Sequence, residues 1–333
     1  MTAMTAASAI AAPLAITATG LSKSYGDKVV LDGIDLRIPE GTVFALLGPN
    51  GAGKTTTVQI LSTLISANAG QAQIAGHDLV RDVDAVRAAI GVTGQFAALD
   101  NLLTAHENLM LMADLQHLAR REGRRRAAEL LHRFELTEAA KKPVSTFSGG
   151  MRRKLDLAMT LVGDPRIIFL DEPTTGLDPR SRRTMWEIIR GLVADDGVTI
   201  FLTTQYLEEA DQLADRIAVL DHGKLVAEGT AEELKRLIPG GHIRLQFADA
   251  SGLESAATLF GSATRDSEAL ALNIPSDGGI PALRAVLDVL DNASVKAEAL
   301  TVRTPDLDDV FLTLTGQSHQ SGTAVNSPKE NAR

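Results

Sequence analysis

A glycine-rich loop near the start of the chain constrains the fold more than any other feature. Residues 48–56 read GPNGAGKTT and follow an apolar run, residues 42–47, that is typical of a buried strand. Glycine lets the backbone turn sharply, so that successive N–H groups converge on anionic oxygens at the positive end of a helix. The spacing G-x-x-x-x-G-K-[ST] is expected by chance in roughly one in a hundred chains of this length, which favours a phosphate-binding loop over an ordinary surface loop.

Within this loop the side chains have distinct predicted tasks. Lys54 is expected to reach the β- and γ-phosphates of a nucleotide, and the hydroxyl of Thr55 is expected to bind Mg²⁺. The candidate cofactor-binding residues of the loop are Gly48, Pro49, Asn50, Gly51, Ala52, Gly53, Lys54, Thr55 and Thr56.

Two adjacent acidic residues end a second apolar run, IIFLDE at residues 167–172. The run is too short for a typical helix, and it reads as a strand of a parallel sheet whose carboxyl end opens at the ligand-binding crevice. Carboxylates in such a place need a metal or a reaction to offset their desolvation. Asp171 is therefore the candidate Mg²⁺ ligand, and Glu172 is the candidate group that polarises an attacking water.

A further glycine segment, FSGGM at residues 147–151, opens a helical pattern and has the composition of a second anion site. Together with the loop and the two acids, it resembles the signature of the nucleotide-binding subunits of ABC transporters. The other motifs of that family stand in the same order: Tyr25 in KSYGDK, Gln95 in GVTGQF, the D-loop GLDP at 176–179 and the switch TTQY at 203–206. The resemblance covers roughly residues 14–238.

The resemblance implies a role for each motif in binding and hydrolysing ATP. Tyr25 would stack on adenine, while Lys54, Thr55 and Thr56 would hold phosphates and Mg²⁺. Gln95 would sense the γ-phosphate through the metal and the attacking water. The signature residues Ser148, Gly149 and Gly150 would contact ATP bound to the opposite subunit, and Asp178 would bridge the two halves. The working unit implied is a homodimer that sandwiches two ATP molecules, a symmetry common among oligomers.

Two positions depart from the usual pattern of the family. Met151 stands where glutamine is commoner, and we interpret it as packing variation in the first turn of a helix. Gln205 stands where histidine is usual. Its amide can hydrogen-bond a γ-phosphate and hold water, but it cannot titrate near neutral pH. The hypothesis is that Glu172 acts as the base and that Gln205 only positions, which makes Glu172, Gln205 and Gln95 the catalytic candidates.

Longer segments narrow the resemblance to the daunorubicin- and doxorubicin-resistance subgroup of actinobacteria. They are GVTGQ, SGGMRRKLDLA, DEPTTGLDPRSR, LTTQYLEEADQLADRIAVLDHG and the later TPDLDDVFLTLTG. This implies the ATP-hydrolysing subunit of an exporter of a lipophilic drug or lipid, which drives a separate integral membrane permease by closure of the dimer. The expected location is peripheral, at the cytoplasmic face of the membrane, with residues 96–103 lining the groove for the permease.

Charge and hydropathy agree with this interpretation. The formal net charge is −9 with no long basic run, which argues against a nucleic-acid partner. No apolar run approaches the ~20 residues of a transmembrane helix. A soluble ABC ATPase acting on ribosomes or in DNA repair is the alternative, although the fused cassettes, coiled coils and zinc hooks of such proteins are not evident. Intact Lys54, Asp171 and Glu172 disfavour a nucleotide sensor that does not hydrolyse.

The expected fold class is α/β: a P-loop NTPase domain of the ABC type over residues 14–238, plus a small α+β module over residues 242–316. Strands are expected at 16–21 and 29–38, the helix of the phosphate loop at 54–66, and a helical insert at about 103–162. The module alternates strand and helix patterns up to a strand at 295–302, an order that suggests a ferredoxin-like fold used for dimerisation or regulation. Residues 1–13 and 317–333 are expected to be a disordered leader and tail.

Overall fold

The computed structural model describes residues 13–94, 98–237, 241–276, 278–303 and 305–316. The chain divides into two compact units between residues 231 and 232, and each is considered by itself. Gln95, the leader at 1–12 and the tail at 317–333 lie outside the described residues.

A six-stranded sheet in the order β10-β9-β3-β8-β7-β6 forms the centre of the first unit. Its strands are β3 (Val43–Leu47), β6 (Ile90–Thr93), β7 (Ile167–Asp171), β8 (Thr199–Thr204), β9 (Arg216–Asp221) and β10 (Lys224–Gly229). All pairings are parallel except that of the edge strand β10. The carboxyl ends of the parallel strands therefore meet at one edge, where ligands of such sheets bind.

A second, antiparallel sheet holds the first strands of the chain. Its order is β2-β1-β4-β5, from β1 (Leu14–Tyr25), β2 (Lys28–Pro39), β4 (Ala69–Ile74) and β5 (His77–Asp78). The predicted strands at 16–21 and 29–38 are confirmed, but they pair here and not in the parallel sheet. Apolar residues of β1 and β2 pack with those of α1 (Lys54–Leu61) and of the central strands in one core.

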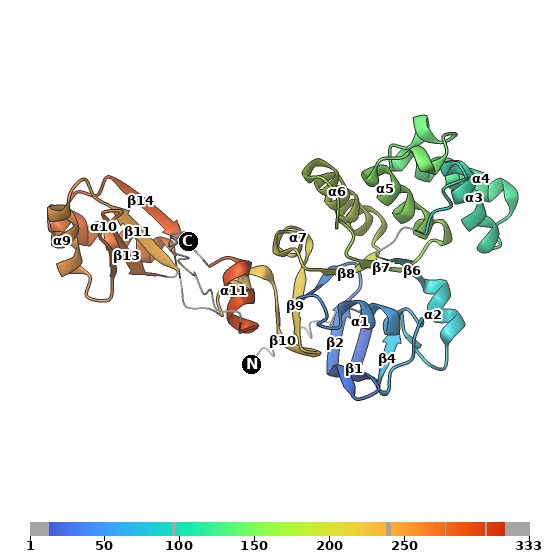
Figure 1. Cartoon of the computed structure of the whole chain (residues 1–333), viewed down its shortest axis with the longest axis horizontal. Coiled ribbons are helices and arrows are strands. Elements are labelled where there is room, and N and C mark those ends of the chain that lie inside the picture. The colour runs from blue at the N-terminus through green and yellow to red at the C-terminus, as the bar shows by residue number, and fades with distance from the viewer. Residues whose placement is uncertain (1–12, 95–97, 238–240, 277, 304, 317–333) are drawn as a thin grey trace, which may run out of the picture. The chain divides into compact units, whose positions relative to one another are not determined.

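Helices cover the two faces of the central sheet. Figure 1 shows α1 and the antiparallel strands on one side, and α6 (Pro179–Asp196) and α7 (Leu207–Leu213) on the other. Helix α2 (Val83–Ala89) precedes β6. The predicted helix at 54–66 was wrong at its end, because α1 stops at Leu61 and Thr63 takes a φ of 63°, outside the helical region.

The insert between β6 and β7 is helical, as predicted. It contains α3 (Ala105–Leu115), α4 (Arg120–Arg133) and α5 (Gly149–Thr160), with 3₁₀ turns at Thr137–Ala139, Val144–Thr146 and Leu161–Gly163. Helix α3 begins with a capping box, in which the Thr104 and Glu107 side chains each accept a bond from the other's backbone N–H. Helix α5 starts at the signature glycines, so the insert places that segment at a helix N-terminus.

The second unit is a small α+β module. After α8 (Ala231–Lys235) come β11 (His242–Gln246), α9 (Ala250–Leu259), β12 (Thr264–Asp266), β13 (Ala271–Pro275), α10 (Ile280–Asn292), β14 (Ala299–Arg303) and α11 (Leu307–Leu314). The antiparallel order β12-β13-β11-β14 is that of a ferredoxin-like fold. The strand predicted at 295–302 begins only at Ala299, because the N–H of Val295 still donates to the carbonyl oxygen of Leu290 in α10, at 3.0 Å, and pairing with β11 starts at Ala299.

Candidate functional site

The glycine loop connects the carboxyl end of β3 to the first residue of α1. A Cβ on Gly48 would lie 2.4 Å from the carbonyl oxygen of Leu220. Gly53 has a φ of 112°, and a Cβ there would lie 2.6 Å from Cδ2 of Leu31. Gly48 therefore needs glycine because the backbone of Leu220 lies so close. Gly53 needs it for close approach and also for its left-handed backbone, which L-residues adopt only with strain.

Gly53→Ala is expected to lower the free energy of unfolding by about 2–4 kcal/mol, since a strained φ is combined with overpacking. Gly51→Ala is the matched control, because Gly51 has a φ of 83° but open space around its Cβ position. That substitution is expected to cost only the strain, about 1–2 kcal/mol. Urea denaturation of both variants measures the difference, and equal losses would show that the approach to Leu31 does not constrain the loop.

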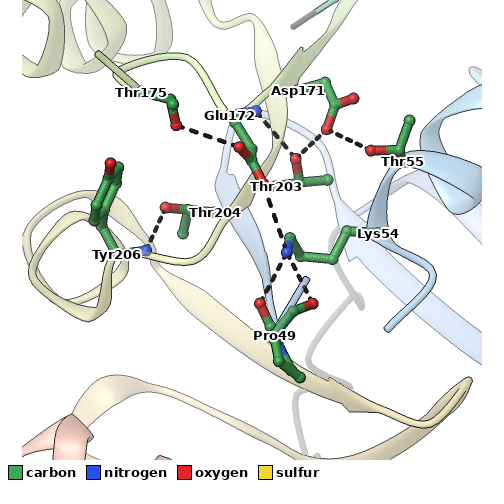
Figure 2. A network of polar contacts seen from close by, with 10 residues as sticks. Pro49, Lys54, Thr55, Asp171, Glu172, Thr175, Thr203, Thr204 and Tyr206 are labelled. Atoms are coloured by element: carbon green, nitrogen blue, oxygen red, sulfur yellow. Dashed lines mark hydrogen bonds and ion pairs between the residues drawn. The ribbon is translucent and has the colours of Figure 1, made fainter. Parts of the chain in front are cut away.

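The side chain of Lys54, the first residue of α1, is buried against the loop that precedes the helix. Its Nζ donates to the carbonyl oxygens of Gly48 at 2.8 Å and Pro49 at 3.2 Å, and it lies 3.7 Å from Oε1 of Glu172 (Figure 2). Burial lowers the pKa of Lys54, while the carboxylates of Glu172 and Asp171 act against this shift. The ammonium group thus faces both the loop and the acid at the end of β7.

Asp171, Thr55 and Thr203 form a cluster of oxygen atoms beside Lys54. Oδ1 of Asp171 accepts hydrogen bonds from the hydroxyls of Thr203 at 2.6 Å and Thr55 at 3.3 Å (Figure 2). The register of β7 against β8 pairs Asp171 with Thr203, which explains this contact. Hydroxyl and carboxylate oxygens are the ligands that Mg²⁺ prefers, so Thr55 and Asp171 fit the expected metal.

Glu172 follows β7 in a strained backbone conformation. Its φ is 50°, a value that costs a non-glycine residue about 1–3 kcal/mol. Its N–H donates to the carbonyl and hydroxyl oxygens of Thr203 at 3.2 and 3.1 Å, and its Oε2 accepts from the hydroxyl of Thr175 at 3.3 Å. Non-glycine residues held in such conformations cluster at functional sites, because only strong surrounding contacts keep them there.

The signature and the D-loop begin two neighbouring helices. The hydroxyl of Ser148 accepts a hydrogen bond from the N–H of Met151 at 3.3 Å and caps α5. Ser148 and the neighbouring Gly149 are both exposed. Asp178 caps α6 and accepts from Ser181 through its hydroxyl at 2.6 Å and its N–H at 3.1 Å, which lowers the pKa of Asp178. A Cβ on Gly150 would lie 2.7 Å from the Ser181 hydroxyl oxygen, so the two helix starts touch.

The remaining candidates lie at the margin of this cluster or outside the described part of the chain. Tyr25 ends β1 and is 52% exposed, and Nζ of Lys23 lies 5.2 Å from its ring centroid. Gln205 directly follows β8 and is half-buried. The structure thus brings together Lys54, Thr55, Asp171 and Glu172 and leaves Tyr25 with a different partner. Gln95 lies in the stretch that is not described.

Several buried groups in this region were not assigned a role by sequence reasoning. Besides Thr203, they are Arg153 and Asp156 of α5 and Glu209 of α7. Oε1 of Glu209 accepts from the hydroxyl of Thr174 at 2.7 Å and from Nε1 of Trp186 at 3.1 Å, and burial raises the pKa of Glu209. Nothing in the sequence pointed to Glu209, because it stands among other polar residues of α7 and its partners are far away along the chain.

The geometry suits one kind of ligand. Backbone N–H groups at a helix start and an ammonium group converge where anionic oxygens can lie, and hard oxygen ligands stand beside them. At the carboxyl edge of a parallel sheet, this arrangement defines a P-loop nucleoside triphosphatase. The helical insert that carries a second glycine segment is the added part that distinguishes ATP-binding cassettes within this class.

Comparison with known proteins leads to the same class. The family described as ABC transporter matches residues 31–175. "Daunorubicin resistance ATP-binding protein DrrA3" of Streptomyces coeruleorubidus is 50% identical over 93% of this chain and 98% of its own. "Daunorubicin/doxorubicin resistance ATP-binding protein DrrA" of Streptomyces peucetius is 46% identical over 91% of this chain and 92% of its own. The chain therefore belongs to the ABC transporter family, as one of its ATP-binding subunits.

A solved structure supports the fold and the reaction. It is a dimeric ATP-binding cassette in a post-hydrolysis state, bound to ADP and Pi. It is 28% identical with a TM-score of 0.59, and the match covers 65% of this chain and 98% of that one. The chain is an ATPase of this family, and the relatives give no support to the alternative of a soluble ATPase that acts on ribosomes or DNA. None of the helices in the described part of the chain has the length and apolar character to cross a membrane.

Proposed function

We propose that this subunit hydrolyses ATP to drive the efflux of a lipophilic drug or lipid through a separate membrane permease. The observation that carries the proposal is the identity with proteins named for daunorubicin resistance, which extends over 93% of the chain and so includes the C-terminal module. The subunit would act at the cytoplasmic face of the membrane as a peripheral protein, without a nucleic-acid partner. The formal net charge of −9 is in keeping with the last point.

Different residues of the site have different roles in the proposed hydrolysis of ATP. The loop amides and Lys54 hold the β- and γ-phosphates, and Thr55 and Asp171, with Gln95, hold Mg²⁺. When bound, the metal neutralises charge on the phosphate oxygens during transfer. Glu172 takes the proton of the attacking water, and Gln205 orients that water. Tyr25, exposed at the end of β1, would stack on adenine after Lys23 leaves its ring.

The signature and the D-loop serve a second copy of the chain. Ser148 and Gly149 are exposed at the start of α5, where backbone N–H groups and the helix dipole favour an anion. Their described contacts do not involve the loop of their own chain, which fits the binding of ATP held by a partner. Two copies in head-to-tail arrangement would then enclose two ATP molecules, with Asp178 near the twofold axis.

Purification from native membranes tests this function. Tagged Glu172→Gln chain is isolated with and without ATP, and proteins that co-purify are identified by mass spectrometry. We expect a hydrophobic multi-span protein in stoichiometric amount. The double variant Lys54→Ala/Glu172→Gln is the control for the effect of ATP. Recovery of ribosomes, of DNA-repair proteins or of the free chain alone would contradict the proposed export function.

A further inference from the structure

We infer that Arg153 is a positioning residue that holds the backbone of Glu172 in place for ATP hydrolysis. Arg153 lies on α5, one turn after the signature glycines, and its side chain reaches the segment that follows β7. The inference rests on the proposed role of Glu172 as the base. It adds a mechanical link, within one chain, between the signature helix and the reacting end of the sheet.

The guanidinium of Arg153 binds the residues on both sides of Glu172. Its Nε donates to the carbonyl oxygen of Pro173 at 2.8 Å, and its Nη2 donates to that of Asp171 at 3.2 Å. The side chain is 10% exposed, so these bonds lie away from solvent. A planar guanidinium fixes two acceptors at a set spacing, which a flexible ammonium group cannot do.

The bonds from Arg153 help to hold Glu172 in its strained backbone conformation. Its φ of 50° is strained, and a strained residue persists only where its neighbours over-determine its conformation. Thr203 holds the N–H of Glu172 from the side of β8, and Arg153 holds the flanking carbonyls from the side of α5. Without the bonds from Arg153, the backbone at Glu172 is free to relax, and the carboxylate moves away from the position in which it takes the proton of the attacking water.

Arg153 also contacts the residue after β6 directly, and its ion-pair partner Asp156 contacts Ala98 further along the chain. Its Nη1 donates to the carbonyl oxygen of Gly94 at 2.8 Å and to Oδ2 of Asp156 at 3.1 Å, while Oδ1 of Asp156 accepts from the N–H of Ala98 at 3.0 Å. Burial lowers the pKa of Arg153 and raises that of Asp156. A buried ion pair is seldom retained for stability alone, since an apolar pair of similar volume often serves as well. Among the described residues, the pair's further hydrogen bonds go to backbone groups at or beyond the carboxyl ends of β6 and β7.

Arg153→Lys tests the inference with the charge retained. The lysine keeps an ion pair with Asp156 but cannot span the carbonyls of Asp171 and Pro173. We expect kcat of the full-length chain to fall about 10- to 100-fold, the cost of misplacing a catalytic group by about 1 Å, with KM for ATP nearly unchanged. Arg152→Lys is the matched control, because that neighbouring guanidinium binds Val144 and Asn101 in the insert.

A second variant, together with a double-mutant cycle between Arg153 and Glu172, distinguishes a positioning role of Arg153 from an effect on folding. Arg153→Met with Asp156→Leu removes both buried charges together, so that neither is left unpaired, and it is expected to fold and to show the same loss of kcat. In a Glu172→Gln background, Arg153→Lys is expected to lower single-turnover phosphate release by less than about threefold, because the group that it positions is already gone.

Two results would overturn the inference. One is wild-type kcat in both Arg153→Lys and the double variant. The other is a loss that is equally large with and without Glu172, which would place the effect of Arg153 elsewhere. Near-normal turnover of Glu172→Gln alone would instead refute the proposed base, and the position held by Arg153 would then have no catalytic meaning.

Discussion

Glu172→Gln is expected to lower kcat for ATP hydrolysis by about 10²–10⁴-fold and to leave nucleotide affinity nearly unchanged, as is typical when a general base is lost. Glutamine fills the same volume and can still accept the hydrogen bond that Thr175 donates to Oε2 at 3.3 Å. It cannot take a proton from water. Steady-state phosphate release at saturating MgATP measures kcat, and equilibrium titration with a fluorescent ATP analogue measures affinity.

Gln205→His is the comparison that separates the base from the group that orients the water. It restores the usual residue of the family at the end of β8, and kcat is expected to stay within about tenfold of the wild-type value, because the proton acceptor is unchanged. If this exchange abolished hydrolysis, or if Glu172→Gln turned over normally, the division of roles between these two residues would be incorrect.

Lys54→Ala is expected to weaken the binding of ATP by about 10- to 100-fold, the usual loss for a hydrogen bond to a charged group. Lys54 is buried, and its Nζ lies at the loop carbonyls of Gly48 and Pro49, where it can reach phosphates held by the same loop. The substitution also leaves Glu172 without its ion pair at 3.7 Å. Calorimetric titration with ATP measures the affinity, and Tm shows whether the fold is retained.

Lys154→Ala is the control for the loss of a lysine. Lys154 pairs with Glu135 at 2.8 Å on the helical insert, and it has no predicted part in binding nucleotide. Its affinity for ATP is expected to equal that of the wild type. Unchanged affinity in Lys54→Ala would refute the assignment of residues 48–56 as the phosphate loop.

The central fold was predictable wherever the local pattern and the tertiary setting agree. The apolar runs before Gly48 and before Glu172 are fully buried strands, β3 and β7, as their composition indicates. The alternating pattern after residue 241 predicted β11, α9, β13, α10 and β14 of the C-terminal module in their order, but not the short strand β12 or the helix α11. Patterns of this kind report which faces of an element are buried, and burial largely determines the element.

Which strands and side chains contact each other in the folded chain could not be predicted in the same way. Strands β1 and β2 are separated by Gly26 and Asp27, a two-residue loop typical of a β-hairpin, but nothing local shows that they join β4 and β5 in a sheet separate from the parallel one. Arg153 bonds to the carbonyl oxygens of Asp171 and Pro173, and carbonyls are alike for every residue type. Glu209 finds its partners Thr174 and Trp186 only once α6 and α7 are packed together. Such contacts belong to the folded chain and leave no mark in the sequence nearby.

The contact between Gly150 and Ser181 restricts how the surface that we propose for binding a second copy can change. Any side chain at position 150 would meet the Ser181 oxygen, which is itself bonded to Asp178. The signature and the D-loop are distant in sequence but lie in contact, so a change in one affects the position of the other. Selection for a new dimer partner would have to alter both segments together, and single substitutions at either would be tolerated only where they leave the other in place.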